Sequence, residues 1–251
     1  MNSGAEKARV LEGIARQISL SEIGSALVVA PHPDDESLGC GGTIALLRQC
    51  GYAVQVLFVS DGTMSHPNSP SYPAERLRTV REAEALEALD TLGVPTENVF
   101  FMRQKDTQVP TSDCAGFADA VEVIYNFLLT VQPATVFVPW RRDPHRDHRA
   151  SWQLLMAAVA KLHKPPRILE YLIWLWELGT EQDMPGRDEV RAWYVPIESV
   201  MALRNQAVAA HRSQVSRLID DDPTAFYLSP ELLMHFDKPR ELFLEQITHH
   251  V

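Results

Sequence analysis

Residues 26–30 form a short, apolar, β-branched run, and Pro31 and Pro33 come just after it. Such a run is typical of a buried strand, and the prolines end that strand because they cannot donate to a sheet. Four ionisable residues share this stiff turn: His32, Asp34, Asp35 and Glu36. Burying so many charges beside a strand is costly unless another group compensates them. A bound divalent cation is the obvious compensator.

The rest of the chain alternates apolar runs with helical patterns, as a series of βαβ units does. We expect strands at 26–30, 53–60, 99–102, 135–139 and 168–174, with helices at about 38–49, 74–92, 116–131 and from 148 to 162. This pattern predicts an α/β fold, a Rossmann-like three-layer sandwich with a mostly parallel sheet. The expected order of its strands is about 3-2-1-4-5.

A length of 251 residues suits a single domain. We expect an N-terminal helix within residues 1–24, an α/β core at 25–178 and a small C-terminal α+β extension at 179–251. The extension begins where the pattern changes after Gly179. Within it the sequence predicts a strand at 192–195, one helix at 197–218 and a last strand at 242–246.

The composition excludes several classes of partner. A net charge of −10 argues against nucleic acid and anionic membranes, which select a basic face. No apolar run approaches the length of a membrane span, and the charged N-terminus lacks the apolar core of a signal peptide. The three cysteines form neither a disulfide framework nor a thiolate zinc site. We therefore expect a soluble, cytoplasmic protein, and whether it forms a homo-oligomer stays open.

A second polar cluster, at 141–148, follows the strand at 135–139. In the expected strand order this strand neighbours the one at 26–30, and ligands bind where such strands end. The two clusters should therefore converge and bring His32 and Asp35 close to His145 and His148. Imidazole and carboxylate ligands suit Zn²⁺ or Fe²⁺, and three of them plus water make an open, catalytic site.

Two motifs resemble those of a known enzyme family. Residues 31–36 together with 38–43 resemble the leading motif of the LmbE/PIG-L metal-dependent de-N-acetylases, and residues 145–148 resemble their second motif, His-x-Asp-His. Arg81-x-x-Glu84 resembles a helix of that family, and His211-x-Ser213-Gln214 resembles a weaker C-terminal motif. Some members carry a tyrosine two residues before the second-motif histidine, where this chain has Asp143.

The resemblance implies a role for each matching residue. It makes His32, Asp35 and His148 the ligands of Zn²⁺, with Fe²⁺ as the alternative metal. It makes Asp34 the general base and His145 the electrophile or proton donor, held in orientation by Asp147. Arg81 would contact the substrate. The implied reaction removes an N-acetyl or similar acyl group from an amino sugar or its conjugate, a small-molecule substrate.

The residues fit this chemistry independently of the resemblance. A metal lowers the pKa of bound water to about 7, and a neighbouring carboxylate takes its proton. The oxyanion then needs positive charge, part of which a protonated imidazole offers. Asp147 beside His145 would favour that charged form.

Several residues keep two interpretations. Asp61, and less strongly Asp106, could bind a sugar hydroxyl or belong to a turn. Arg81 and Glu84 could be a helix-surface pair. Glu36 could support a metal ligand or be a first-turn acid favoured by the helix dipole, and we prefer the support of a ligand. His211 either reaches the site or fills the core. The glycines at 39, 41 and 42 indicate close packing of a helix on a strand, and a loop as long as 62–73 is usually functional or disordered.

Two other functions compete with the hydrolase. A non-haem Fe(II) oxygenase would use two histidines and one carboxylate, but it gives Asp34 and His145 no task. A non-catalytic Rossmann-like binding module would need a phosphate-binding loop, and the G-x-G-x-x-G spacing is absent.

Overall fold

The computed structural model describes residues 10–186 and 188–247, which build an eight-stranded sheet of order β1-β7-β8-β6-β5-β2-β3-β4. The strands are β1 (Arg16–Gln17), β2 (Ala26–Ala30), β3 (Val54–Ser60), β4 (Val99–Gln104), β5 (Thr135–Pro139), β6 (Arg167–Tyr171), β7 (Val190–Pro196) and β8 (Arg240–Gln246). The five predicted core strands are parallel and keep their expected order, as β4-β3-β2-β5-β6. The predicted α/β class with a mostly parallel sheet is confirmed.

The sheet continues beyond the predicted core. β8 pairs antiparallel with both β6 and β7, and β1 adds a parallel edge next to β7. The predicted order of five strands is therefore incomplete, because the C-terminal segment extends the central sheet. Phe243 and Leu244 of β8 are fully buried, and Phe243 packs on Phe137 of β5 with ring centroids 4.8 Å apart.

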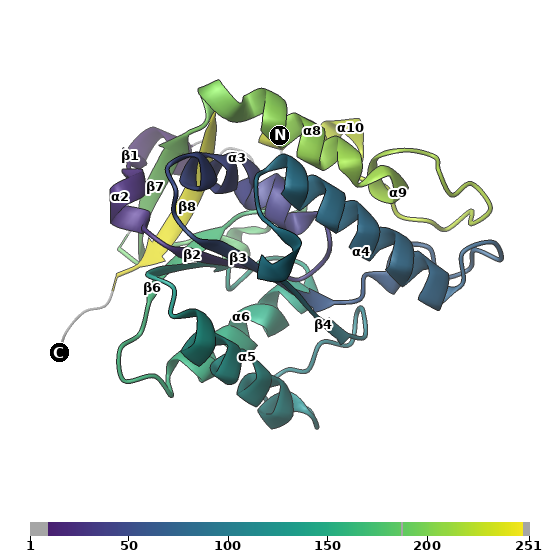
Figure 1. The fold of residues 1–251 in the computed structure, drawn as a ribbon, viewed down its shortest axis with the longest axis horizontal. Helices are drawn as coiled ribbons and strands as arrows, with labels where there is room; N and C mark the ends of the chain where they lie inside the picture. The colour runs from purple at the N-terminus through teal and green to yellow at the C-terminus, as the bar shows by residue number, and fades with distance from the viewer. Residues whose placement is uncertain (1–9, 187, 248–251) are drawn as a thin grey trace.

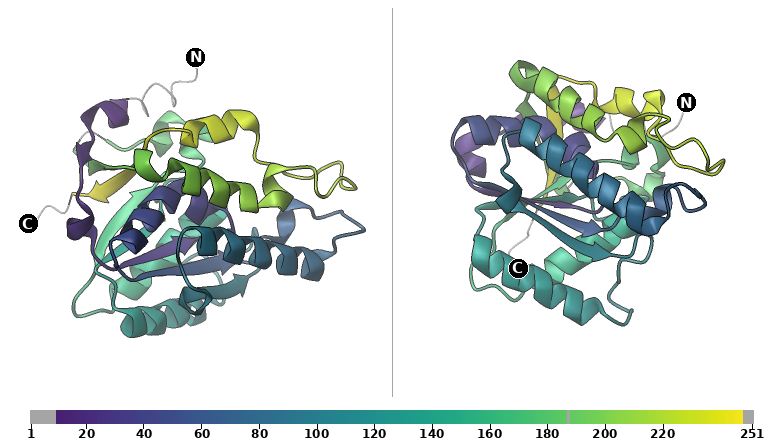
Figure 2. Two further views of the ribbon diagram at one scale, coloured as in Figure 1. Left: turned by 45° about the horizontal axis from the view of Figure 1, so that its top comes forward. Right: turned by 45° about the vertical axis from the view of Figure 1, so that its right-hand side comes forward.

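Helices cover the two faces of the sheet (Figure 1). One face packs against α3 (Asp35–Gln49), α4 (Ala74–Thr91) and α8 (Met201–Ala210), and the other against α5 (Phe117–Val131) and α6 (Arg146–Val159). Alternate residues of β2 serve the two layers. Val28 joins the cluster that includes Ile44 of α3, whereas Leu27 joins the one that includes Ile124 of α5. The further views in Figure 2 show the same three layers.

The remaining elements are short. They are α2 (Leu20–Ile23), η1 (Thr63–Ser65), η2 (Thr96–Asn98), α7 (Leu175–Leu178), η3 (Glu181–Asp183), η4 (Glu198–Val200), α9 (Arg212–Val215) and α10 (Pro230–Phe236). None of the helices in the described residues is long and apolar enough to cross a membrane.

Two helix predictions were wrong in their extent. The expected helix at 197–218 is divided into η4, α8 and α9, with a break at His211, whose φ of −77° and ψ of 55° leave the helical region. The expected N-terminal helix lies partly outside the described residues. Its described part contains helix at 10–14, strand β1 and then α2, which opens with a capping box between Ser19 and Glu22.

Glycines let α3 pack closely against its neighbours, as the sequence predicted. A Cβ added at Gly39 would lie 2.4 Å from Cδ2 of Tyr171, and one added at Gly42 would lie 2.6 Å from Cγ2 of Ile197. Both approaches are far below a normal van der Waals contact. The start of α3, which follows the acidic turn, is therefore fixed by contacts on β6 and on the segment before η4.

This packing predicts the effect of adding a methyl group. Gly42→Ala should lower the free energy of unfolding by about 1–3 kcal/mol, because overpacking outweighs the gain in helix propensity. Chemical denaturation monitored by circular dichroism measures the change. Gly13→Ala is the matched control, since a Cβ there meets nothing within 4 Å. Equal stability of the two variants would contradict the close packing.

Candidate metal centre and catalytic pocket

The two polar clusters meet at one edge of the sheet. β2 and β5 are paired neighbours, and the chain passes from the end of each strand into a turn and then a helix. Asp34 is the N-cap residue of α3, and His145 is that of α6. The predicted convergence of His32 and Asp35 with His145 and His148 is therefore found in the structure.

Asp35 lies between two imidazoles. Its Oδ2 is 3.2 Å from Nδ1 of His32 and 3.2 Å from Nε2 of His148. Ligand atoms at about 2.0–2.1 Å from a tetrahedral Zn²⁺ are themselves about 3.3 Å apart. Both ring nitrogens of His148 are buried, and no hydrogen bond to either is found within the described residues. The three predicted ligands thus have donor types that suit zinc, and the two distances to Asp35 match the spacing of neighbouring zinc ligands.

Other donors crowd the same place. Potential ligand atoms lie within 4.8 Å of one another in two groups, His32 with His145 and His148, and His32 with Asp106 and Asp147. The second group occupies the opposite side of the His32 ring from Asp35, because Asp106 Oδ1 is 3.1 Å and Asp147 Oδ2 is 3.6 Å from Nε2. These two carboxylates can accept the Nε2 proton and leave Nδ1 free for a metal.

His148 has a carboxylate behind it as well. Oδ1 of the fully buried Asp143 lies 3.3 Å from Nδ1 of His148, on the side away from Asp35. Asp143 also accepts hydrogen bonds from the backbone N–H groups of His145 and Trp174. Carboxylates behind metal-binding imidazoles are common in zinc proteins, where they fix the tautomer and the ring orientation.

The charges of the cluster depend on one another. Burial lowers the pKa of His148, but Asp35 and Asp143 outweigh it and raise the pKa to about 9. Burial likewise opposes the charged form of His32, yet Asp106, Asp147 and Asp35 hold its pKa well above the ordinary value. The surrounding carboxylates therefore stabilise positive charge at the centre.

Asp34 has an unusual backbone conformation. Its φ of 133° is rare for a residue with a side chain, and such strain persists only where neighbours enforce it. The backbone N–H of Asp34 donates to Oε2 of Glu36 at 2.9 Å, and Nη2 of Arg81 donates to Oδ2 of Asp34 at 3.0 Å. Burial is the main factor that raises the pKa of Asp34, to about 6, and Arg81 opposes it.

His211 supports this turn from the far end of the sequence. It is buried, and its Nε2 lies 2.9 Å from Oε1 of Glu36, which also accepts a hydrogen bond from Ser37 Oγ. Of the two interpretations of His211, the buried, hydrogen-bonded histidine of the core is the one found, and its partner is Glu36. Glu36 thereby links the C-terminal segment to the backbone of Asp34.

His145 is oriented differently from the prediction. Its Nδ1 accepts a hydrogen bond from the backbone N–H of Asp147 at 3.2 Å, so the neutral ring carries its proton on Nε2. The Asp147 carboxylate faces His32 and accepts the N–H of Thr107 at 2.6 Å. Burial, His148 and His32 lower the pKa of His145 to about 4, against the expected charged form.

Arg81 and Asp61 both serve the structure of the loops. The guanidinium of Arg81 is buried and donates to the carbonyl oxygens of Gly62 and Pro33 as well as to Asp34. It is part of the pocket wall, and the surface pair with Glu84 is not formed, because Glu84 bonds Ser213. Asp61 is absent from the described pocket wall, and its Oδ1 accepts from Thr63 and from the N–H of Asp106.

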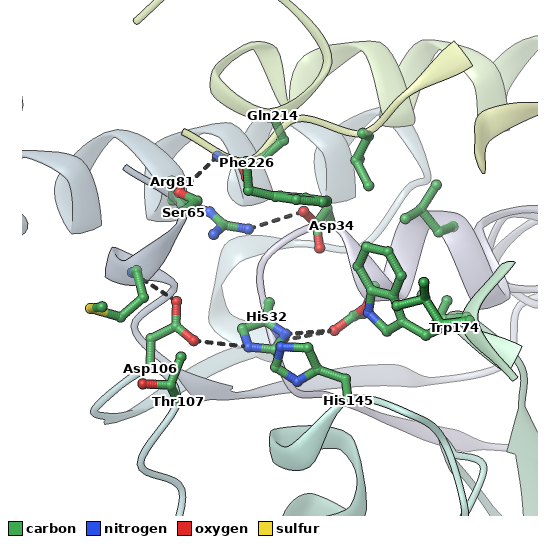
Figure 3. Close-up of a pocket in the computed structure, with 16 residues that line it drawn as sticks. His32, Asp34, Ser65, Arg81, Asp106, Thr107, His145, Trp174, Gln214 and Phe226 are labelled. Atoms are coloured by element: carbon green, nitrogen blue, oxygen red, sulfur yellow. Dashed lines mark hydrogen bonds and ion pairs between the residues drawn. The ribbon is translucent and has the colours of Figure 1, made fainter. Parts of the chain in front are cut away.

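A pocket of about 350 Å³ opens over these groups. His32, Asp34 and His145 reach it from the two turns, as Figure 3 shows, with Asp106 on one side and Trp174 on the other. The loop at 62–73 forms part of the wall and is tied to the C-terminal segment. Ser65 O accepts from Phe226 N–H at 2.8 Å, and Asn68 N–H donates to Asp222.

The sequence reasoning missed one residue that the site depends on. Asp143 was noted only as the replacement of a tyrosine, yet it lies behind His148. A carboxylate shortly after a buried strand, two residues before His145, is the signal that could have identified it. Asp106 was predicted only as a weak candidate for binding a sugar, whereas it contacts Nε2 of His32. The sequence did not indicate this contact because the two residues are distant in the chain.

Comparison with known proteins adds the family. Residues 27–159, which include both motifs, match the model of the PIG-L family, described as GlcNAc-PI de-N-acetylase. The chain belongs to the PIG-L family.

Relatives of this PIG-L family chain include named deacetylases. The probable N-acetyl-alpha-D-glucosaminyl L-malate deacetylase 2 of Bacillus cereus is 28% identical over 78% of this chain and 86% of its own length. The structure of N,N'-diacetylchitobiose deacetylase from Pyrococcus horikoshii gives a TM-score of 0.67 at 25% identity and covers 93% of this chain and 87% of that one. GalB of Pseudomonas putida, a hydratase, shares the fold alone, with a TM-score of 0.61 and 19% identity over 91% of this chain and 98% of its own.

The position of Asp143 in this PIG-L family chain predicts a change in metal affinity. Asp143→Asn keeps the size of the side chain but removes the charge behind His148, so zinc affinity should fall about 10–100-fold. Titration of the metal-free protein against a competing chelator measures it. Asp90→Asn, on the exposed side of α4, is the control. An unchanged affinity in Asp143→Asn would contradict this role.

Proposed function

We propose that this chain is a zinc-dependent hydrolase that removes an N-acetyl, or similar small acyl, group from an amino sugar or an amino-sugar conjugate. One observation carries the proposal. Asp35 Oδ2 is equally close to the imidazoles of His32 and His148, and Asp34 and His145 face the same pocket. Metal ligands, a carboxylate base and an imidazole are the groups that amide hydrolysis requires.

We assign the metal to His32, Asp35 and His148, with Asp106, Asp147 and Asp143 holding the two rings. When bound there, zinc would polarise the carbonyl and activate a water molecule at neutral pH. Fe²⁺ suits the same ligand types and is the alternative metal. The remaining steps belong to side chains of this protein.

Asp34 acts as the general base in this proposal. Its carboxylate lies at the pocket wall, and the contacts with Glu36 and Arg81 fix its backbone and side chain. A carboxylate held in this way takes a proton from the attacking water and later returns it to the leaving nitrogen. Since Arg81 uses both terminal nitrogens on Pro33, Gly62 and Asp34, it acts by positioning the base.

His145 acts as a neutral hydrogen-bond donor. Because Nδ1 accepts the N–H of Asp147, the Nε2–H is the group that can donate into the pocket. Such a donor stabilises the oxyanion that forms when the carbonyl is attacked. This assignment replaces the charged imidazole that the sequence suggested.

The oxygenase alternative explains fewer of these features. It would use His32, His148 and Asp35 as iron ligands, but it assigns no role to the strained backbone of Asp34 or to the fixed tautomer of His145. A binding module without turnover would need neither.

A screen for released amine tests the function. The purified protein, with its metal content measured, is incubated with N-acetylated amino sugars and their conjugates, and primary amine is quantified. We expect release from at least one N-acetylglucosamine conjugate and about one metal ion per chain. Release from other amides alone would keep the reaction class and refute the sugar substrate.

Two variants separate chemistry from metal binding. Asp34→Ala should lower turnover by about 10²-fold or more while keeping its metal, because it removes only the base. His32→Ala should lose metal and activity together. Metal analysis and initial rates on the same preparations check both. Activity that survives in His32→Ala after its metal is lost would contradict the mechanism.

A further inference from the structure

We propose that the substrate carries an uncharged, apolar substituent beside the scissile amide, and that Trp174, Leu178 and Phe226 bind it. This inference rests on the proposed hydrolase function and deepens it. It concerns the part of the pocket that the reaction itself does not use.

The pocket wall is made of two chemically different sets of side chains. Asp34, Asp106 and His145 surround the reaction centre, and Ser65 and Gln214 add polar groups nearby. Oε1 of the buried Gln214 accepts no hydrogen bond from the described residues, so it is available for a sugar hydroxyl. The other set is apolar, and its members are Leu38, Met64, Ile173, Trp174, Leu178, Phe226 and Leu228.

Large apolar side chains are left exposed at the rim of this pocket. Leu178 is 56% exposed, Met64 is 40% exposed and Phe226 is 38% exposed, although they come from three separate segments of the chain. A gathering of exposed apolar side chains next to a cavity marks a binding surface. Because this surface is continuous with the catalytic pocket, its natural occupant is part of the substrate.

Aromatic rings connect the reaction centre to this rim. The Trp174 ring lies 6.4 Å from His145, with 27° between the ring planes, and 5.5 Å from Phe226. In Figure 3, Trp174 lies on the side of the pocket away from Asp106, and the ring of Phe226 lies above Asp34, close to Gln214. A group attached to the sugar or to the acyl carbon would therefore meet an apolar wall directly.

The wall is preformed. Phe226 is held by its N–H bond to Ser65 O, and Leu228 N–H donates to Gln214 O at 2.9 Å. Trp174 N–H is bonded to Asp143. The contacts that fix the polar side of the pocket thus also fix the apolar side, and little ordering is required on binding.

A charged substituent does not fit this pocket. Carboxylates are recognised by free arginine or lysine, but Arg81 is the only such residue in the described pocket wall. Its two terminal nitrogens donate to Gly62, Pro33 and Asp34, which leaves only its buried Nε without a partner among the described residues. The malate group in the name of the Bacillus cereus relative would therefore meet no arginine or lysine with free terminal nitrogens in the described pocket wall. A second sugar would stack on the rings, but Leu178 and Leu228 offer its hydroxyls no polar side-chain partner.

The test compares substrates that differ only in the substituent. N-acetylglucosamine is offered as its methyl, hexyl and phenyl glycosides, as its malate conjugate and as N,N'-diacetylchitobiose. The methyl glycoside of N-hexanoylglucosamine tests the acyl side. We expect kcat/KM for one apolar compound to exceed that of the N-acetyl methyl glycoside by about tenfold or more. A gain with the hexyl or phenyl glycoside places the substituent on the sugar, and a gain with the hexanoyl compound places it on the acyl group.

Variants connect the preference to the wall. Phe226→Ala and Leu178→Ser should each reduce the ratio of kcat/KM between the preferred apolar compound and the methyl glycoside toward one. Leu129→Ala is the matched control, because Leu129 is also an exposed leucine, 46% accessible, but lies on α5 outside the pocket. It should leave the ratio unchanged.

The outcomes distinguish this inference from the proposed function. If no N-acyl sugar is hydrolysed, the proposed function itself is wrong. If the methyl glycoside is hydrolysed but the apolar compounds are no better, or if the malate conjugate or chitobiose is preferred, the hydrolase stands and the apolar substituent is refuted. A preference that persists in Phe226→Ala and Leu178→Ser would also refute the assigned wall.

Discussion

The site depends on charge balance in a buried place. Carboxylates from three loops surround the imidazoles of His32 and His148, and water is largely excluded from both groups. Isolated charges of one sign would be too costly there. The carboxylates therefore require positive charge at the centre, which protonated imidazoles or a divalent cation can provide. This requirement explains why such a polar cluster is stable at the end of two buried strands.

The C-terminal segment takes part in the same network of buried charges. Asp34 is held at a positive φ by Glu36, and Glu36 is held by His211. Glu84 of α4 accepts hydrogen bonds from the N–H and the hydroxyl of Ser213 in α9, directly after His211. A break between α8 and α9 places His211 and Ser213 where they can make these contacts. The segment that looked like an extension of the fold is thus a support of the proposed base.

Local patterns predicted the parts of the structure that short-range physics determines. The apolar run before Pro31 gave the strand, and the alternation of elements gave the order of the five core strands. Partners distant in sequence were beyond reach, because periodicity does not say which edge β8 joins or which ring Asp147 faces. Asp61 shows the same limit, since a turn was one of its two interpretations but its bond to the N–H of Asp106 depends on a residue far along the chain.

The contrast between the two sides of the pocket suggests how specificity is divided. Groups of the catalytic side are bound to one another, so a change there disturbs several partners at once. The side chains of Trp174, Leu178 and Phe226 take less part in such hydrogen bonds and ion pairs, and they line the pocket mainly with apolar surface. Substitutions on that wall can change the accepted substituent while the metal ligands and Asp34 keep their contacts. In the proposed enzyme, the residues assigned to the reaction are therefore distinct from those assigned to the choice of substrate.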